Sequence, residues 1–199
     1  MKALRIVLWV LVAAAAIAAA AIYMRQPEGL PAPRSTDADV SFGGPFTLVD
    51  SSGQPFASSR LAGRPYAIFF GFTHCPDVCP TTLARLAKLR RQMGDDREFS
   101  IVFVTVDPER DGPAQVGRYA DLIGSPVIGL TGSPAQIAQV KKQYGIFSEK
   151  AGGGAGDDYM VDHTATVLLF DRDGKFQSTI SQEESDEAAL AKLRRLTSA

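Results

Sequence analysis

The chain has 199 residues, of which 45% are hydrophobic and 22% charged, and its formal net charge is −1. These proportions are ordinary for a globular protein, so most of the chain is able to bury a core. No basic tract follows the first few residues, which argues against nucleic-acid binding because that needs a clustered cationic surface. Only two cysteines are present, so a disulfide-stapled scaffold is excluded.

The first element is an uncharged run of 18 residues, Ile6 to Tyr23, which follows Lys2 and Arg5. A helix of that length reaches roughly 27 Å, close to the ~30 Å hydrocarbon thickness of a bilayer. We expect residues 1–24 to be a single-pass anchor with a cytoplasmic N-terminus, because basic residues before a span stay on that side. A cleaved signal peptide is the alternative, since Ala18-Ala19-Ala20 offers cleavage sites.

Either reading of the N-terminus sends the rest of the chain to the periplasmic side of a bacterial-type inner membrane. Residues 25–41 are rich in proline, polar and charged residues and show no apolar periodicity. This composition predicts a flexible linker that holds the following domain, residues 42–199, away from the bilayer.

The remaining residues alternate between strand and helix signals. Strands are expected at 46–50, 66–72, 99–106, 127–130, 164–170 and 175–180, and helices at 80–94, 113–123, 134–144 and 185–196. The run 66–72 is apolar throughout, as expected of a strand covered on both faces. Ser133, Pro134 and Gln136 match a capping box. The order predicts an α/β, thioredoxin-like fold, with a central mixed sheet flanked by helices.

Cys75 and Cys79 follow the predicted strand 66–72, at the strand end where open α/β sheets place active sites. On a helical turn this spacing puts both residues on one face, with side-chain roots about 5–6 Å apart. Two thiolates so placed are able to bind one metal ion, and the same separation also allows a disulfide. Cys79 is expected at the N-cap of a helix beginning at Pro80, where free N–H groups lower a thiol pKa.

Three interpretations of the cysteine pair are open. A structural disulfide would close a very short loop, where the stabilisation is small. A redox-active pair would make the chain a thiol-disulfide oxidoreductase of thioredoxin type, although those proteins have two intervening residues and this chain has three. A metal site is the third interpretation, and it needs a further ligand.

Only His74 and His163 are available as further ligands. His74 directly precedes Cys75, and adjacent residues point in different directions. His163 reaches the cysteines if the predicted strand 164–170 lies beside 66–72. Structural zinc almost always takes four protein ligands, so a three-ligand site of two sulfurs and one imidazole disfavours zinc and suits copper.

Three segments resemble the Sco/SenC family of copper proteins, which take part in assembling cytochrome c oxidase. They are GFTHCPDVCP at 71–80, VTVDPERDGP at 104–113, and YMVDH at 159–163 with FDRDGKF at 170–176. The segments stand in the family's order, and the likeness spans roughly residues 42–199.

The resemblance implies that Cys75, Cys79 and His163 bind one copper ion, Cu(I) or Cu(II), with Asp107 beside the site. Alternatively, Asp107 and Asp111 end a strand and cap the next helix. The glycine run 152–154 predicts a loop that lets His163 approach or leave the metal.

The function that the resemblance implies is that of a metallochaperone. Such a protein would deliver copper to the binuclear copper site of cytochrome c oxidase subunit II, or reduce that site's cysteines through a thiol-disulfide reductase activity. Another periplasmic copper chaperone or a thioredoxin-like reductant would be a further partner. A thiol-disulfide oxidoreductase without a metal role is the alternative function.

Overall fold

The computed structural model describes residues 9, 42–94, 99–152 and 159–198. The chain divides into two units, residues 1–39 and 40–199, and the second unit carries the sheet described below. The predicted anchor and linker, residues 1–24 and 25–41, lie outside the described residues except for Trp9. Within the described ranges, no helix has the length and apolar character needed to cross a bilayer.

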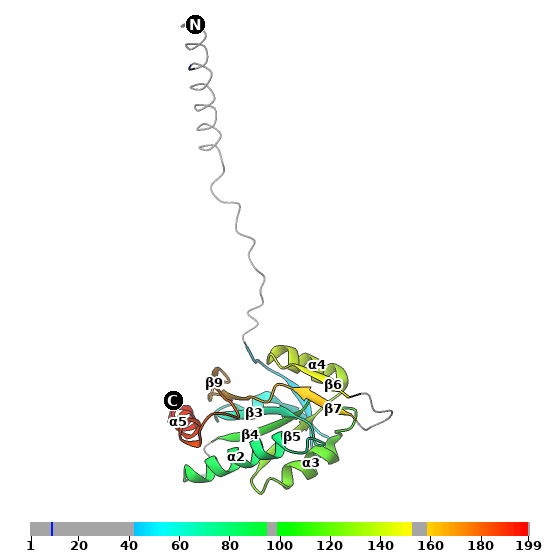
Figure 1. Ribbon diagram of the computed structural model, residues 1–199, viewed down its shortest axis with the longest axis horizontal. Helices are drawn as coiled ribbons and strands as arrows, with labels where there is room; N and C mark the ends of the chain where they lie inside the picture. Colours follow the sequence, from blue (N-terminus) through cyan, green and yellow to red (C-terminus); the bar gives the residue numbers. More distant parts are fainter. Residues whose placement is uncertain (1–8, 10–41, 95–98, 153–158, 199) are drawn as a thin grey trace. The chain divides into compact units, whose positions relative to one another are not determined.

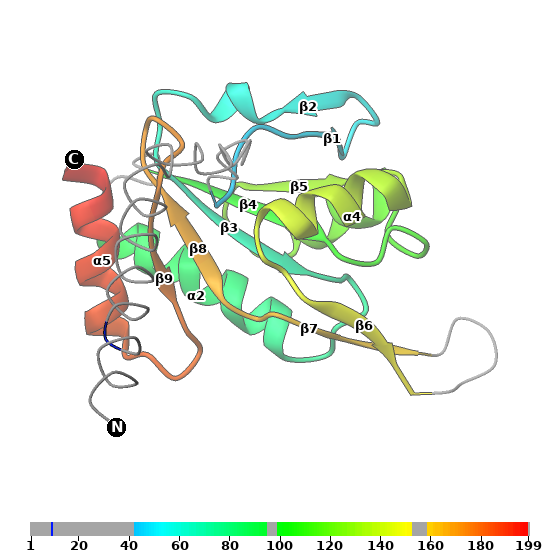
Figure 2. The same ribbon diagram turned by 90° about the horizontal axis from the view of Figure 1, so that it is seen from above.

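A seven-stranded mixed sheet forms the centre of the domain, in the order β2-β1-β5-β4-β3-β8-β9 (Figures 1 and 2). Its strands are β1 Thr47–Asp50, β2 Pro55–Ala57, β3 Tyr66–Gly71, β4 Ser100–Thr105, β5 Val127–Thr131, β8 Val167–Phe170 and β9 Phe176–Ile180. Strands β3, β4 and β5 are parallel, whereas β1 pairs with β5, and β8 with β3, in antiparallel fashion. The pairing of β3 with β8 meets the condition under which His163 was predicted to reach the cysteines.

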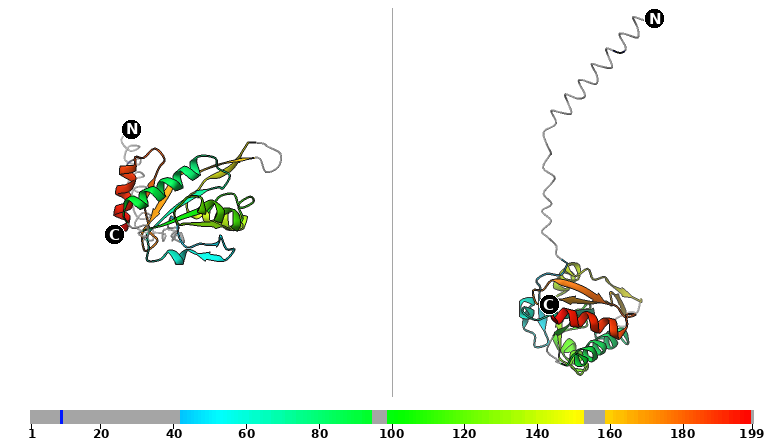
Figure 3. Two further views of the ribbon diagram at one scale, coloured as in Figure 1. Left: turned by 90° about the horizontal axis from the view of Figure 1, so that it is seen from below. Right: turned by 90° about the vertical axis from the view of Figure 1, so that its left-hand side faces the viewer.

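Helices cover both faces of the sheet, as the sequence predicted (Figure 1). The helices are α2 Val78–Gln92, α3 Pro113–Asp121, α4 Pro134–Gln143 and α5 Asp186–Ser198, and a short 3-10 helix, η1, covers Ser58–Leu61. Helices α2 and α3 lie on one face and α4 on the other. Helix α5 packs beside α2, as the view from below shows (Figure 3).

A two-stranded antiparallel ribbon, β6 Ser148–Ala151 and β7 Met160–His163, extends from the domain (Figure 2). Its register pairs Ser148 with His163 and Ala151 with Met160. Neither strand was predicted from the sequence, and the segment SEKA of β6 is polar and short. The glycine-rich loop expected after Ala151 falls mostly on residues 153–158, outside the described residues.

Two predicted starts are wrong by two or more residues, and one strand of the central sheet was not predicted. Helix α2 begins at Val78 rather than at Pro80, with Asp77 as its N-cap. Pro80 is tolerated at the third helical position because the N–H groups of the first turn have no intrahelical acceptor. Strand β8 begins at Val167 rather than at residue 164, and the short strand β2 was not predicted. The capping box of α4 is confirmed. The Ser133 hydroxyl oxygen accepts a hydrogen bond from the Gln136 amide, and the Gln136 side chain accepts one from the Ser133 amide.

The apolar core runs along the central strands, and all six residues of β3 are buried. At the end of the sheet where β3 begins, the rings of Tyr66 and Phe170 stack with their centroids 4.9 Å apart. Phe42, Tyr144 and Phe176 complete this aromatic cluster around Phe170. The opposite end of β3, after Gly71, carries the cysteines.

Candidate metal centre

The cysteine loop leaves the end of β3 and returns as the first turn of α2. The amide of Cys75 donates to the Phe72 carbonyl at 3.2 Å, which closes a turn, and Cys79 is the second residue of α2. Gly71 lies directly beneath the helix: a Cβ at that position would be 2.7 Å from the Cys79 sulfur. Only glycine leaves room for the sulfur to sit against the strand.

Asp111 anchors the cysteine loop to β4 from a fully buried position. Its carboxylate accepts from the Thr73 amide at 2.8 Å, from the Thr73 hydroxyl at 2.5 Å and from the Thr105 hydroxyl at 2.6 Å. Charge-assisted hydrogen bonds of this kind are stronger than neutral ones. The alternative interpretation, in which Asp111 caps the next helix, is wrong, because the N-cap of α3 is Gly112 and no side chain caps it.

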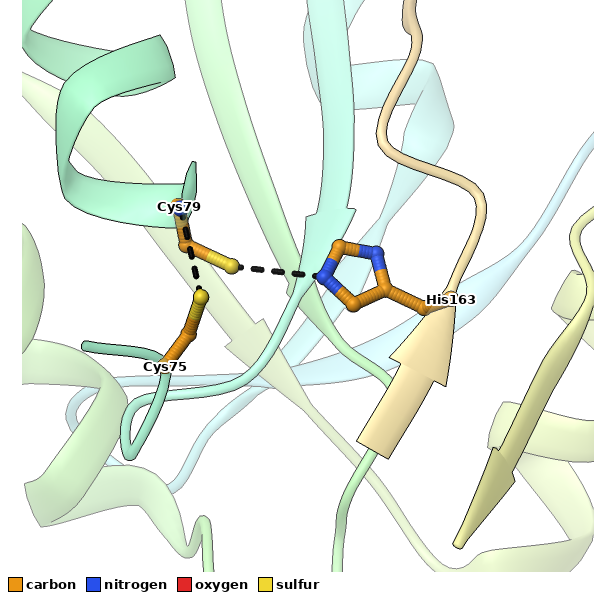
Figure 4. A group of neighbouring side chains, drawn as sticks. All are labelled: Cys75, Cys79 and His163. Carbon is orange, nitrogen blue, oxygen red and sulfur yellow. Dashed lines mark hydrogen bonds between the residues drawn. The ribbon is translucent and has the colours of Figure 1, made fainter. Parts of the chain in front are cut away.

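His163 ends strand β7 and faces the cysteines (Figure 4). Its Nε2 atom is 3.4 Å from the sulfur of Cys79, and its Nδ1 atom is 3.1 Å from the carbonyl oxygen of Thr164. The rings of Phe69 and Phe72 meet the imidazole edge-on, at centroid distances of 6.0 and 5.8 Å. Two aromatic rings and one carbonyl therefore fix the orientation of the imidazole.

The contact with Thr164 sets the tautomer of His163. A carbonyl oxygen only accepts hydrogen bonds, so Nδ1 carries the proton and the lone pair of neutral Nε2 points at the Cys79 sulfur. Burial lowers the pKa of His163, against a smaller raising effect of the Thr164 carbonyl, and keeps the ring neutral. A neutral imidazole whose other nitrogen is held by a carbonyl is the usual form of a metal-binding histidine.

The two sulfurs and the Nε2 side of His163 form a triangle of ligand atoms that all lie within 4.8 Å of one another. Bonds of about 2.3 Å to sulfur and about 2.0 Å to nitrogen would bring the three ligand atoms to within about 4.6 Å of one another around one ion. The triangle therefore fits a single metal ion. His74 stands apart from this group, with its side chain 53% exposed and its Nδ1 atom 3.5 Å from Asp111.

The predicted lowering of the Cys79 pKa is wrong. Cys79 is fully buried, and burial raises its pKa, with a further contribution from its hydrogen bond with Cys75. Desolvation of the thiolate outweighs the favourable position near the N-terminus of α2. A buried thiol with a raised pKa is a poor attacking group, so Cys79 is not suited to be the nucleophile of a disulfide exchange, whereas metal binding would displace its proton.

Asp107 does not cap α3 either. Its carboxylate instead binds Tyr159, the residue directly before β7. Its carboxylate accepts from the hydroxyl of Tyr159 at 2.8 Å and from Nε of Arg110 at 2.5 Å. Arg110 and Tyr159 were not singled out from the sequence, although both lie within the quoted motifs. Their pairing depends on the β6–β7 ribbon, which was not predicted from the sequence.

A groove of about 250 Å³ runs past the site. Cys75 and His163 line it together with Met160, Asp77 and Asp162, whereas Cys79 lies behind them in the core. The candidate metal centre is therefore reached from solvent on the side of Cys75 and His163.

Comparison with known proteins places these features in a family context. A family model described as SCO1/SenC matches residues 34–198. Protein SCO2 homolog, mitochondrial, of Mus musculus is 35% identical over 155 residues, covering 76% of this chain and 61% of the mouse protein. Protein SCO2, mitochondrial, of Saccharomyces cerevisiae is 35% identical over 158 residues, covering 78% and 52% of the two chains. The chain thus spans between half and two thirds of the length of these relatives.

Among solved structures, that of Bradyrhizobium japonicum ScoI with copper bound is similar to this chain. It superposes with a TM-score of 0.71 and 42% sequence identity, and the match covers 78% of this chain and 99% of that one.

Proposed function

This chain belongs to the SCO1/SenC family, and from that premise we propose that it binds one copper ion through Cys75, Cys79 and His163. The observation that carries the proposal is the triangle of ligand atoms, brought together by β3, α2 and β7 from distant parts of the chain. The relative solved with copper bound, at 42% identity, supports copper as the metal.

The chemistry of the ligand set favours copper over other metals. Two thiolates supply soft donors and the imidazole a borderline one, a combination that suits copper in both oxidation states. A site with three protein ligands keeps one side open for exchange, whereas structural zinc sites close with four. The groove beside Cys75 and His163 lies on that open side.

We propose that the copper is cargo for the assembly of cytochrome c oxidase, delivered to the binuclear copper site of subunit II. The groove at the metal centre supports a transfer role, because an acceptor is able to reach Cys75 and His163 from solvent. A second candidate function is reduction of the cysteines of that copper site, favoured by the proximity of the two free thiols of Cys75 and Cys79. In that role Cys75, which lines the groove, would be the attacking sulfur, because Cys79 is buried and its pKa is raised.

The proposed place of action is the periplasmic face of a bacterial-type inner membrane. The apolar run 6–23 and the basic residues before it support a single-pass anchor, residues 1–24, followed by a linker, residues 25–41. In that compartment another copper chaperone or a thioredoxin-like reductant would supply the metal or the electrons.

The test is a copper titration of the reduced 199-residue chain in detergent, followed by spectroscopy. We expect one copper ion per chain and a thiolate-to-Cu(II) charge-transfer band. Cys75→Ser, Cys79→Ser and His163→Ala should each weaken binding by about tenfold or more, since each removes one of three ligands. The matched control is His74→Ala, which removes the half-exposed histidine next to Cys75.

Two results would contradict the proposal. If His74→Ala weakened copper binding as much as His163→Ala, the assigned ligand set would be wrong. If the wild-type chain bound no copper but reduced insulin disulfides, the protein would be a thiol-disulfide oxidoreductase. Oxidation of Cys75 and Cys79 to a disulfide should block copper loading, because neither sulfur then remains a thiolate.

A further inference from the structure

We propose that Arg110 and Tyr159 are positioning residues for the copper site, holding the β6–β7 ribbon so that His163 faces the two sulfurs. The inference rests on the proposed function, because it concerns the orientation of one of the proposed ligands. Neither residue belongs to the triangle of ligand atoms, and both act on it through their neighbours.

Arg110, Tyr159 and Asp107 form a closed set of contacts at the loop end of the ribbon, where Met160 pairs with Ala151. The guanidinium of Arg110 lies 3.6 Å from the centre of the Tyr159 ring, and its NH1 group donates to the Tyr159 carbonyl at 2.9 Å. Arg110 Nε donates to Asp107, and the Tyr159 hydroxyl donates to the same carboxylate. The side chains of Arg110 and Asp107 are only 8% and 2% exposed, so these interactions are weakly screened by solvent.

Arg110 also contacts the cysteine-bearing side of the site. Its guanidinium lies 5.8 Å from the ring of Phe72, and Phe72 meets the imidazole of His163 edge-on at 5.8 Å and 88°. Phe72 in turn binds the Cys75 amide through its carbonyl. The guanidinium of Arg110 therefore packs against both Tyr159, which leads to His163, and Phe72, which leads to the cysteines.

The ribbon needs such a tether because it is a weak element by itself. It has two short strands that pair with each other and form a separate sheet, and an isolated two-stranded ribbon is marginally stable in water. Val161 is the buried residue of β7. Tyr159 directly precedes β7, so holding Tyr159 fixes the point from which the four residues to His163 extend.

A second cation, Lys150, offers a matched comparison with Arg110. Its ammonium lies 4.5 Å from the centre of the same Tyr159 ring and pairs with Glu109, but its side chain is 53% exposed. Exposed ion pairs contribute little because water screens them and their side chains lose entropy. Arg110 differs in having a side chain that is only 8% exposed and in presenting a planar group that stacks and donates at once.

The experiment is a double-mutant cycle on the 199-residue chain, with copper as the probe. Arg110→Gln and Tyr159→Phe are each made in the wild type and in His163→Ala. We expect each to weaken copper binding by about tenfold or more in the wild type, as measured for residues that orient metal ligands. In His163→Ala the same changes should have an effect within about twofold, since the ligand they orient is gone. Lys150→Gln should stay within about twofold in both backgrounds.

A readout without metal accompanies the cycle. In the reduced, metal-free chain, Arg110→Gln should speed amide exchange at residues 160–163 and weaken the nuclear Overhauser contact between the Phe72 and His163 rings. Lys150→Gln should leave both unchanged. Tyr159→Phe keeps the ring and removes only the hydroxyl, so it remains informative if Arg110→Gln folds poorly.

Equal losses of affinity in the wild-type and His163→Ala backgrounds would overturn the inference, because Arg110 would then act on the cysteines or on the whole fold. Unchanged exchange at 160–163 would overturn it as well. A failure of the proposed function looks different: His163→Ala alone would then bind copper as tightly as the wild type.

Discussion

At the scale of single residues, Cys79 shows how burial overrides a favourable local position. The free N–H groups in the first turn of α2 would stabilise a thiolate, but the sulfur lies against Gly71 and the strand beneath it, out of contact with water. Desolvation dominates, and the pKa of the thiol rises. The metal-free fold is therefore more stable when the Cys79 thiol is protonated than when it is a thiolate.

This raised pKa predicts a stability that falls at alkaline pH. The unfolded chain releases the Cys79 proton near pH ~8.5, whereas the folded domain keeps it to higher pH. Above that point the unfolded state binds fewer protons than the native state, so the free energy of unfolding falls as pH rises. The contribution of Cys79 to the free energy of unfolding is fully present below the pKa of the unfolded thiol. It is lost as the pH rises from there through the pKa of the folded thiol.

Urea unfolding of the reduced, metal-free chain should show this at pH 7.5 and 9.5. We expect the wild type to lose about 1 kcal/mol more than Cys79→Ala over that interval. An identical decline in the two proteins would show that the Cys79 thiol titrates alike in the folded and unfolded states.

The candidate ligands were predictable from the sequence, because the cysteines that indicate them lie close together in the chain. The cysteine spacing and the need for a third ligand identified Cys75, Cys79 and His163 as candidates, and the structure brings their ligand atoms together. The anchoring role of Asp111 was missed because its partners Thr73 and Thr105 become neighbours only when β3 and β4 pair. The direction of the Cys79 pKa was missed for a similar reason, since burial is a property of the folded chain.

At the scale of elements, the end of β3 determines where the Cys79 sulfur lies. A side chain at Gly71 would meet that sulfur at 2.7 Å and the ring of Phe69 at 3.0 Å. We predict that Gly71→Ala lowers the free energy of unfolding by about 1–3 kcal/mol, the usual cost of overpacking a core. It should also weaken copper binding, because the sulfur has to move away from the strand.

Gly129→Ala is the matched control for that substitution. Its Cβ would lie 2.7 Å from the Val116 carbonyl of α3, so it crowds the same face of the sheet at a place away from the sulfurs. Unfolding measurements should show similar destabilisation in both variants, and copper titration should show a loss only in Gly71→Ala. A comparable loss of affinity in Gly129→Ala would mean that the effect comes from the sheet as a whole.

Elements were predictable in proportion to their apolar content. Strands β3 and β4 are nearly continuous apolar runs, and both were found close to their observed bounds. The β6–β7 ribbon was not found, since it has few buried side chains and its pairing depends on the rest of the domain. The start of α2 was misplaced by two residues because Pro80 suits several positions of a first turn.

At the scale of the whole domain, stability and metal chemistry lie at opposite ends of the sheet. The aromatic cluster around Phe170 packs where β3 begins, and the ligand triangle forms beyond the point where β3 ends. The thioredoxin-like arrangement was predictable from the order of helices and strands. The side chains that surround each end of β3 were not predictable, because they come from segments far apart in the sequence. Phe42 and Phe176, whose rings are in contact, are an example.

This separation predicts a variant that loses stability but keeps the site. Phe170→Ala should lower the free energy of unfolding by about 3–5 kcal/mol, as expected for removing a fully buried aromatic side chain. Copper affinity, measured at a temperature where the variant is folded, should stay within about twofold of the wild type. Phe176→Ala, which removes a ring that is 40% exposed, should cost less. A large drop in affinity for folded Phe170→Ala would show that the two ends are coupled.

The two sulfurs differ in exposure, so the site has a side open to the groove, at Cys75, and a side buried in the core, at Cys79. An incoming donor or acceptor group reaches Cys75 and His163 from the groove, whereas the Cys79 sulfur is buried behind them. Loading of the metal would then begin at Cys75 and His163, which line the groove, and the buried sulfur of Cys79 would be the last of the three ligands to bind.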